Sequence, residues 1–215
     1  MYDFISGPLV WVAFLVFFGG LLYKFVTTYA AARREKVVLP TFSLKHGLRS
    51  LAHWVIPFRN RNTRLRPIFT LVSFGFHTCL LVTPLFLMAH NVLWRRAFGV
   101  SLPSIPDPLA DVMTVIVILG GAFFFARRIA VPVVRYVSDW KDFVLLLVAV
   151  APFVTGFLST HQVLPGEKLL ILHIVTGVAW LVIIPFTRIV HMLWYPFTRA
   201  FMGSEFGAVR HARDW

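Results

Sequence analysis

The stretch Lys168–Tyr195 reads KLLILHIVTGVAWLVIIPFTRIVHMLWY, and this apolar run decides the fold. A transmembrane helix needs about 20 consecutive, mainly apolar residues, so the run is long enough to cross a bilayer. It carries His173 and His191, which are 18 residues apart. At 100° per residue this spacing makes five whole turns, so one helix would carry both imidazoles on the same face, about 27 Å apart. The sequence predicts a spanning helix with a histidine near each membrane boundary.

The composition also predicts an integral membrane protein. Hydrophobic residues make up 58% of the 215-residue chain and charged residues only 14%, whereas a soluble domain carries about 25% charged residues. The net charge of +12 is concentrated between the apolar runs, as the positive-inside rule expects, so we predict no nucleic-acid partner. The single cysteine, Cys79, excludes a disulfide within the chain, a cysteine-ligated cluster and C-x-x-C-H haem attachment.

We predict an all-α integral membrane protein, a bundle of five transmembrane helices in a single membrane domain over residues 1–215. The five predicted spans are residues 7–30, 67–94, 109–125, 143–160 and 168–195. The N-terminal run lacks a basic region and a small-residue cleavage site, so we interpret it as a retained span. Apolar residues at helical spacing over residues 43–58 predict an amphipathic helix that lies in the membrane interface.

The loop charges predict the orientation. The segment 31–66 holds nine basic residues: Arg33, Arg34, Lys36, Lys45, Arg49, Arg59, Arg61, Arg64 and Arg66. The connection 95–108 holds two, the connection before the fourth span is basic again, and the next connection has only Lys168. Since basic loops stay in the cytoplasm, we predict an outside N-terminus and a cytoplasmic C-terminus.

Four of the eight histidines lie inside predicted spans, where ionisable residues are costly and indicate function. The second and fifth spans run in opposite directions, so depth pairs His90 with His173 near the outer face and His77 with His191 near the inner face. Each pair could supply both axial ligands of one haem b. The alternative is four separately hydrogen-bonded histidines.

The second span fits this pairing less simply than the fifth. His77 and His90 are 13 residues apart, which is about 220° around an ideal helix and about 20 Å along it. They share a face only if the span is deformed, and Pro84 between them could kink it. Pro185 could do the same before His191.

Two neighbouring residues are candidates for cofactor contact. Gly177 lies four residues after His173, where a small residue would let a porphyrin approach the backbone; ordinary helix packing explains it equally well. Arg188 lies one turn before His191 and could pair with a haem propionate.

The chain resembles the membrane cytochrome b subunit of respiratory nitrate reductase in its five spans, outside N-terminus and histidine pairs on the second and fifth spans. Three segments resemble more closely the b-type subunits of the Hmc, Tmc and Dsr complexes of sulfate-reducing bacteria: FHTCLLVTPLFLMAHNVLW, DWKDFVLLLVAVAPFVTGFLSTHQ and LLILHIVTGVAWLVIIPFTRIVHMLW. The spacing in the second span is longer here than in the nitrate reductase subunit.

The resemblance implies two non-covalent haems b with His77, His90, His173 and His191 as iron ligands. It also implies an electron-transfer subunit in a bacterial inner membrane that takes part in sulfate respiration. The implied partners are a cytoplasmic iron–sulfur subunit related to heterodisulfide reductase, a periplasmic multihaem cytochrome c and other membrane subunits.

His161, at the outer end of the fourth span, is the candidate catalytic residue. An imidazole that titrates near pH 6.5 could accept a proton from a bound quinol, with menaquinone as the candidate second cofactor; a solvated loop histidine is the alternative. For the whole chain, the alternative function is a polytopic transporter or assembly protein whose intramembrane histidines bind a metal or relay protons.

Overall fold

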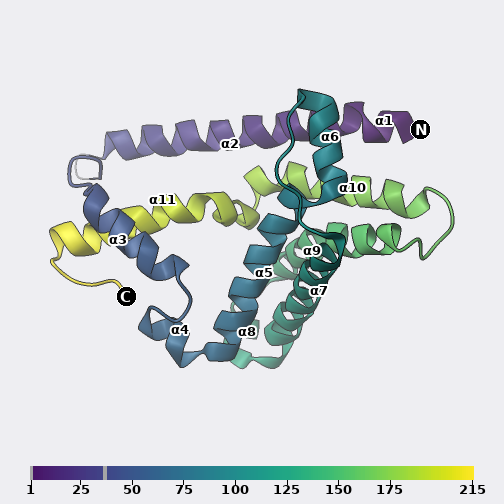
Figure 1. The fold of residues 1–215 in the computed structure, drawn as a ribbon. Helices are drawn as coiled ribbons and strands as arrows, with labels where there is room; N and C mark the ends of the chain where they lie inside the picture. Colours follow the sequence, from purple (N-terminus) through teal and green to yellow (C-terminus); the bar gives the residue numbers. More distant parts are fainter. Residues whose placement is uncertain (1, 36–37) are drawn as a thin grey trace. The chain divides into compact units, whose positions relative to one another are not determined.

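The computed structural model describes residues 2–35 and 38–215, and Lys36 of the basic segment lies outside them (Figure 1). Over this part of the chain the protein is 81% helical and has no strand, which confirms the all-α class. Five of the described helical stretches are long and apolar enough to cross a membrane: Tyr2–Arg34, Pro67–Phe86, Asp107–Ala130, Trp140–Thr160 and Lys168–Phe186. The chain is therefore a multi-pass membrane protein. Its orientation and its organisation as one membrane domain stay predictions.

The chain divides into two compact units. Unit 1 comprises Met1–Ser6 and Leu71–Trp180, and unit 2 comprises Gly7–Thr70 and Leu181–Trp215.

Unit 1 is built around α7. It holds α1 (Tyr2–Ser6), most of α5 (Pro67–Phe86), α6 (Met88–Phe98), α7 (Asp107–Ala130), α8 (Pro132–Tyr136), α9 (Trp140–Thr160) and most of α10 (Lys168–Ile183). Adjacent glycines let two helices approach α7 closely: a Cβ at Gly120 would lie 2.9 Å from the Phe76 ring, and one at Gly121 would lie 2.5 Å from Val150. Val117, one turn earlier, is fully buried.

The start of α9 is fixed by side chains, because the first backbone N–H groups of a helix lack partners within it. Asp139 and Asp142 form a capping box, in which Asp139 accepts from the Lys141 N–H at 2.8 Å and Asp142 accepts from the Asp139 N–H at 3.1 Å. Arg128 near the end of α7 lies 3.6 Å from the buried Asp142 carboxylate. This ion pair links the ends of the two helices.

Unit 2 contains two helix contacts, that of α2 with the turn after α10 and that of α3 with the C-terminal helix. It holds α2 (Pro8–Arg34), α3 (Leu44–Val55), α4 (Arg61–Leu65), the 3-10 turns η1 (Ile184–Phe186) and η2 (Arg188–Val190), α11 (His191–Ser204) and the π-helical turn η3 (Glu205–Val209). The α2 helix meets η1 at Gly20, where a Cβ would lie 2.7 Å from Pro185. The α3 helix lies along α11, and Gly203 of α11 faces Ser50 of α3.

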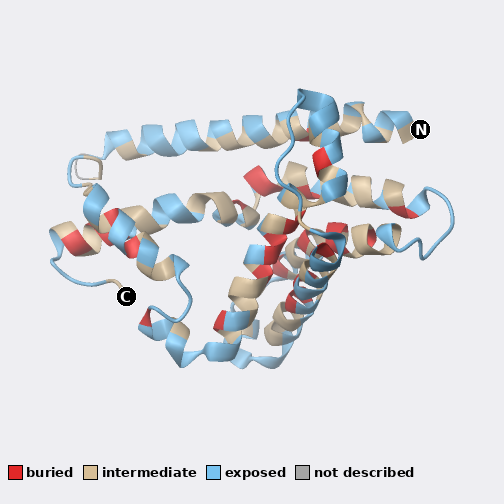
Figure 2. Cartoon of the chain, in the orientation of Figure 1, coloured by how far each residue is buried: buried red, intermediate tan, exposed pale blue. Residues whose placement is uncertain are grey.

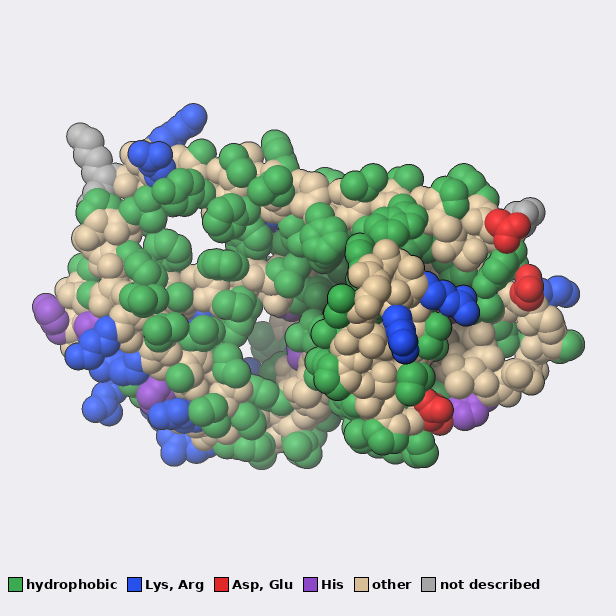
Figure 3. Space-filling model, turned by 45° about the horizontal axis from the view of Figure 1, so that its top comes forward, with side chains coloured by type: hydrophobic (Ala, Val, Ile, Leu, Met, Phe, Trp, Pro, Cys, Tyr) green, Lys and Arg blue, Asp and Glu red, His purple; other side chains and the backbone are tan. Residues whose placement is uncertain are grey.

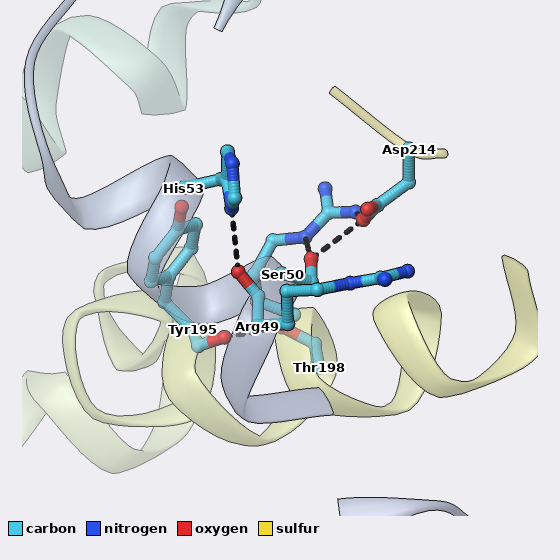
Figure 4. Close-up of polar contacts among 7 residues, drawn as sticks. Arg49, Ser50, His53, Tyr195, Thr198 and Asp214 are labelled. Atoms are coloured by element: carbon cyan, nitrogen blue, oxygen red, sulfur yellow. Dashed lines mark hydrogen bonds and ion pairs between the residues drawn. The ribbon is translucent and has the colours of Figure 1, made fainter. Parts of the chain in front are cut away.

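The C-terminal segment clamps α3 onto α11 (Figure 4). The Ser50 hydroxyl donates to the Asp214 carboxylate at 2.6 Å, and Arg199 of α11 both donates to Ser50 Oγ at 3.0 Å and pairs with Asp214. Trp215 stacks on the His53 ring at a centroid distance of 4.0 Å. The Arg199–Asp214 pair is almost fully shielded from solvent, and removing one partner of such a pair is strongly destabilising.

Large apolar side chains remain exposed along the spanning helices, and α2 is the clearest case (Figure 2). Leu15 and Tyr23 are 72% and 70% exposed. Hydrophobic side chains cover much of the visible surface in Figure 3. In a bilayer this surface needs no protein partner, because lipid chains are as apolar as leucine.

Two predicted spans are interrupted. The prediction of one helix from residue 67 to 94 fails at Leu87, where ψ is 132° and α6 starts afresh. Pro84 lacks a backbone N–H and disrupts the preceding turn, and the extended Leu87 lets Ile105 N–H donate to the Phe86 carbonyl at 2.9 Å. His77 and His90 therefore lie on different helices, and the 13-residue phase argument does not apply.

The prediction of one helix from Lys168 to Tyr195 is also wrong, because α10 ends at Ile183. Two 3-10 turns follow, and Thr187 between them is extended, with φ −124° and ψ 178°. Pro185 cannot donate the hydrogen bond that would continue the helix. The argument that places His173 and His191 on one face of a single helix is thus invalid.

The close contact at Gly203 predicts a specific sensitivity. A Cβ there would lie 2.1 Å from the Ser50 Cβ, so Gly203→Ala must separate α11 from α3, and overpacking of this kind costs about 1–3 kcal/mol. We expect the thermal unfolding midpoint of the purified protein to fall. Gly19→Ala on α2 is the matched control, since a Cβ there meets nothing within 4 Å. Equal midpoints for the two variants would contradict this packing.

Candidate functional site

His90 and His173 come together in unit 1. Their ring centroids are 6.0 Å apart and their planes differ by 16°. His90 comes from α6 and His173 from α10. The two rings that the sequence paired by depth thus lie close together, and their role as ligands near the outer face stays a prediction.

A loop holds His90 in position. Asn91, the next residue, is buried; its side-chain oxygen accepts from the Leu102 N–H at 3.2 Å and its amide donates to Ser104 Oγ at 2.9 Å. The loop is joined to the end of α5 by the hydrogen bond from Ile105. The break at Leu87 and this loop together set the direction of α6.

Both rings are oriented through Nδ1. His90 Nδ1 lies 2.8 Å from the Pro84 carbonyl oxygen, and His173 Nδ1 lies 2.9 Å from the Pro152 carbonyl oxygen. A carbonyl only accepts, so each Nδ1 carries the proton and donates, and the ring lone pair is then on Nε2. A ligating histidine usually has this arrangement, in which the other ring nitrogen donates to a carbonyl or carboxylate.

The distance between the rings fits a shared metal. Two imidazoles that bind one metal through Nε2 at about 2.0–2.1 Å on opposite sides hold their centroids about 6 Å apart. The observed centroid separation, 6.0 Å, equals this distance, and the near-parallel ring planes are also those of two stacked rings. His53 also donates Nδ1–H to a carbonyl, that of Arg49 at 2.8 Å, so the tautomer alone is not specific. The pairing of two such rings is the distinguishing feature.

The α9 helix supports the His173 ring, although no site residue was predicted on its membrane-spanning part. It supplies the Pro152 carbonyl, and a Cβ at Gly156 would lie 2.9 Å from His173 Cε1. The hydroxyls of Thr155 and Thr176 are 3.1 Å apart and join α9 to α10 one turn away. Pro152 and Gly156 are four residues apart on one helix face, and this pattern of two poor helix formers inside a span was the signal that could have revealed them.

His77 and His191 belong to different units. His77 Nδ1–H donates to the Ser73 carbonyl at 2.7 Å within α5, and His191, the first residue of α11, donates to the Arg188 carbonyl at 2.8 Å. Both rings therefore have the same tautomer as the outer pair. Their pairing as inner ligands stays a prediction.

The two predicted contact residues differ in what the structure shows. At Gly177 an added Cβ would meet nothing within 4 Å, so close helix packing does not account for a glycine there. Arg188 uses its backbone carbonyl to orient His191. The predicted roles of both residues in cofactor contact stay predictions.

His161 has an acidic partner that the sequence did not reveal. Its Nε2 lies 3.3 Å from the Asp111 carboxylate on α7, and its ring centroid lies 4.4 Å from that of Phe157. Both polar side chains are partly exposed, 43% for His161 and 38% for Asp111.

Within residues 2–35 and 38–215 no group of three His, Cys, Asp or Glu side chains converges on one point. Haem iron takes four ligands from the porphyrin and needs only axial ligands from the protein. Two imidazoles are the number of axial ligands that such a haem would take, and the haem itself stays a prediction.

Comparison with known proteins gives one informative match. No protein-family model matches the chain, and no solved structure matches it. A curated relative from Nitratidesulfovibrio vulgaris strain Hildenborough, named simply "Protein", is 36% identical over 215 residues, which cover 98% of this chain and 95% of the relative. The chain belongs to the same family as this relative.

Proposed function

We propose that the protein is a di-haem b membrane subunit of a respiratory redox complex and carries electrons across the membrane. The single observation that carries the proposal is the His90–His173 pair, with ring centroids 6.0 Å apart and both Nδ1 atoms oriented by backbone carbonyls. His77 and His191 would hold the second haem, with Gly177 and Arg188 as candidate contacts.

The chemistry follows from the number of axial ligands. A haem b with two axial imidazoles supplies one-electron transfer, because it leaves the iron no position for oxygen or substrate. The residues of this chain orient the two rings and set their basicity: the Pro84 and Pro152 carbonyls accept from Nδ1, and Gly156 leaves room for the ring of His173. Hydrogen bonds of this kind are among the factors that tune a metal site.

The proposed setting is the inner membrane of a bacterium. The electron donor would be a periplasmic multihaem cytochrome c, the menaquinone pool or both, and the acceptor a cytoplasmic iron–sulfur subunit related to heterodisulfide reductase. Five apolar helices support the membrane location, and the resemblance to the Hmc, Tmc and Dsr subunits supports the partners. Moving one charge across the membrane is worth about 2.3 kcal/mol per 100 mV, so the direction of transfer matters energetically.

His161 is the proposed proton acceptor if quinol is the donor. When quinol is oxidised to quinone it loses two electrons, which would pass one at a time to the proposed haems, and two protons. The imidazole would take up one of these protons and the outside water the other. Asp111, 3.3 Å from Nε2, would stabilise the resulting imidazolium.

The first test counts haems in single histidine variants. The purified wild-type protein should contain two haems b by the pyridine haemochrome assay and show an α band in its reduced-minus-oxidised spectrum. His90→Ala and His173→Ala should each remove the same haem, and His77→Ala and His191→Ala the other. His53→Ala is the matched control, since this ring also donates Nδ1–H to a carbonyl. Wild-type protein without an α band would refute the proposal.

The second test uses the support from α9. A Cβ at Gly156 would lie 2.9 Å from His173 Cε1 and 3.0 Å from Nδ1, so Gly156→Ala must move the ring. We expect loss of the His90–His173 haem or a shift in its reduction potential in a redox titration, with the other haem unchanged. Gly19→Ala should leave both haems as in the wild type. An unaltered titration curve for Gly156→Ala would show that this ring is not a ligand.

The third test concerns the quinol reaction. His161→Ala should slow reduction by a menaquinol analogue at least tenfold, since a positioned base contributes about 10²–10⁴-fold. Reduction by dithionite should be unchanged because it needs no proton acceptor. Asp111→Asn should give a smaller loss, since it leaves the imidazole in place. A wild-type rate of quinol-driven reduction in His161→Ala would dismiss His161 from this role.

A further inference from the structure

The α3 helix in unit 2 is amphipathic, but its polar side is buried and its apolar side is exposed, the reverse of a helix in a soluble protein. Its small polar side, with Gly47 and Ser50, is buried against α11. Its apolar side points away: Leu44, Leu48 and Val55 are 63%, 54% and 54% exposed. These three residues lie at positions i, i+4 and i+11, so they form one stripe along the helix. A stripe of this kind needs an apolar environment outside the protein.

Exposed cations border the stripe. Lys45 and Arg49 each follow a stripe residue by one position, which places them about 100° around the helix from it. Four more exposed arginines follow in the same unit: Arg59, Arg61, Arg64 and Arg66. Residues 38–66 contain no aspartate or glutamate. Basic side chains gather at the left of Figure 3. Residues 38–66 therefore present positive charges, without any negative charge among them, next to the apolar stripe of α3.

The C-terminal clamp helps to orient one of these cations. The Arg49 guanidinium lies 4.9 Å above the Trp215 ring, and Asp214 next to it is held by Ser50 and Arg199. A guanidinium on an aromatic face keeps its charge and its donors toward the surroundings. Arg49 is thus positioned by the fold and is not a freely rotating surface side chain.

We propose that α3 and the cations beside it form a binding site for an anionic phospholipid. The acyl chains would cover Leu44, Leu48 and Val55, and the phosphate would lie between Lys45 and Arg49. In the sequence α3 lies between α2 and α5, two helices long and apolar enough to span a membrane, so a position at the membrane surface is part of this proposal. An acidic soluble protein would match the charges but would leave the apolar stripe in water, so the lipid is the better partner.

The test is a binding titration on the detergent-solubilised full-length protein. The probe is a fluorescent short-chain phosphatidylglycerol, and the reference is the same probe with a phosphocholine headgroup. Each exposed cation near a membrane adds to the affinity for anionic lipid. The double variant Lys45→Gln with Arg49→Gln should therefore weaken binding of the phosphatidylglycerol probe roughly tenfold or more. The matched control is Arg95→Gln with Arg96→Gln, an exposed basic pair at the end of α6, which should change binding less than twofold.

The double variant Leu44→Gln with Leu48→Gln should weaken the binding of both probes. Helical circular dichroism and a single elution peak check that each variant is folded.

Four results would overturn the proposal. Equal affinity for the two headgroups would remove the anionic preference, and an equal loss in the Arg95/Arg96 control would make the effect non-local. Full displacement of the probe by millimolar inorganic phosphate would indicate a plain anion site. Displacement by polyglutamate, with unchanged probe affinity in the Leu44/Leu48 variant, would indicate an acidic protein partner.

Discussion

The hydrogen bond from a histidine ring to a backbone carbonyl is the interaction on which the candidate site depends. Inside a membrane no water can satisfy a carbonyl, and an unsatisfied backbone group costs several kcal/mol. A ring N–H needs a partner there for the same reason, and the carbonyls of Pro84 and Pro152 accept it from His90 and His173. This bond fixes the ring plane and sets the tautomer.

The sequence predicted the fold class well, because hydropathy averages over many residues. Hydropathy located five apolar helices long enough to span a membrane. The depth argument paired His90 with His173, whose ring centroids lie 6.0 Å apart, and their role as ligands stays a prediction. Helix continuity was predicted poorly. Pro84 and Pro185 were recognised as possible kinks, but the helices end at Phe86 and Ile183. Whether a proline kinks a helix or ends it depends on tertiary contacts, such as the one from Ile105 to the Phe86 carbonyl, that no local pattern encodes.

The supporting residues of the site escaped prediction for a related reason. Gly156, Thr155 and Asp111 lie on helices that carry none of the four intramembrane histidines, so a search along the histidine helices passes over them. Their roles arise from contacts across helices: Gly156 against the His173 ring, Thr155 with Thr176, and Asp111 with His161. Sequence reasoning finds the groups that carry chemistry, whereas the groups that position them become visible only in three dimensions.

The break at Leu87 makes the position of the His90 ring independent of the register of α5. In a continuous helix the position of His90 would be tied to that of His77 by a fixed rise and rotation per residue, and any insertion between them would turn one ring away from its partner. Here the direction of α6 is set by Leu87 and by the loop that Asn91 and Ile105 anchor. Sequence changes in this loop can therefore re-aim the His90 ring while α5 keeps its register. A family with this design can alter the His90–His173 pair without rebuilding α5.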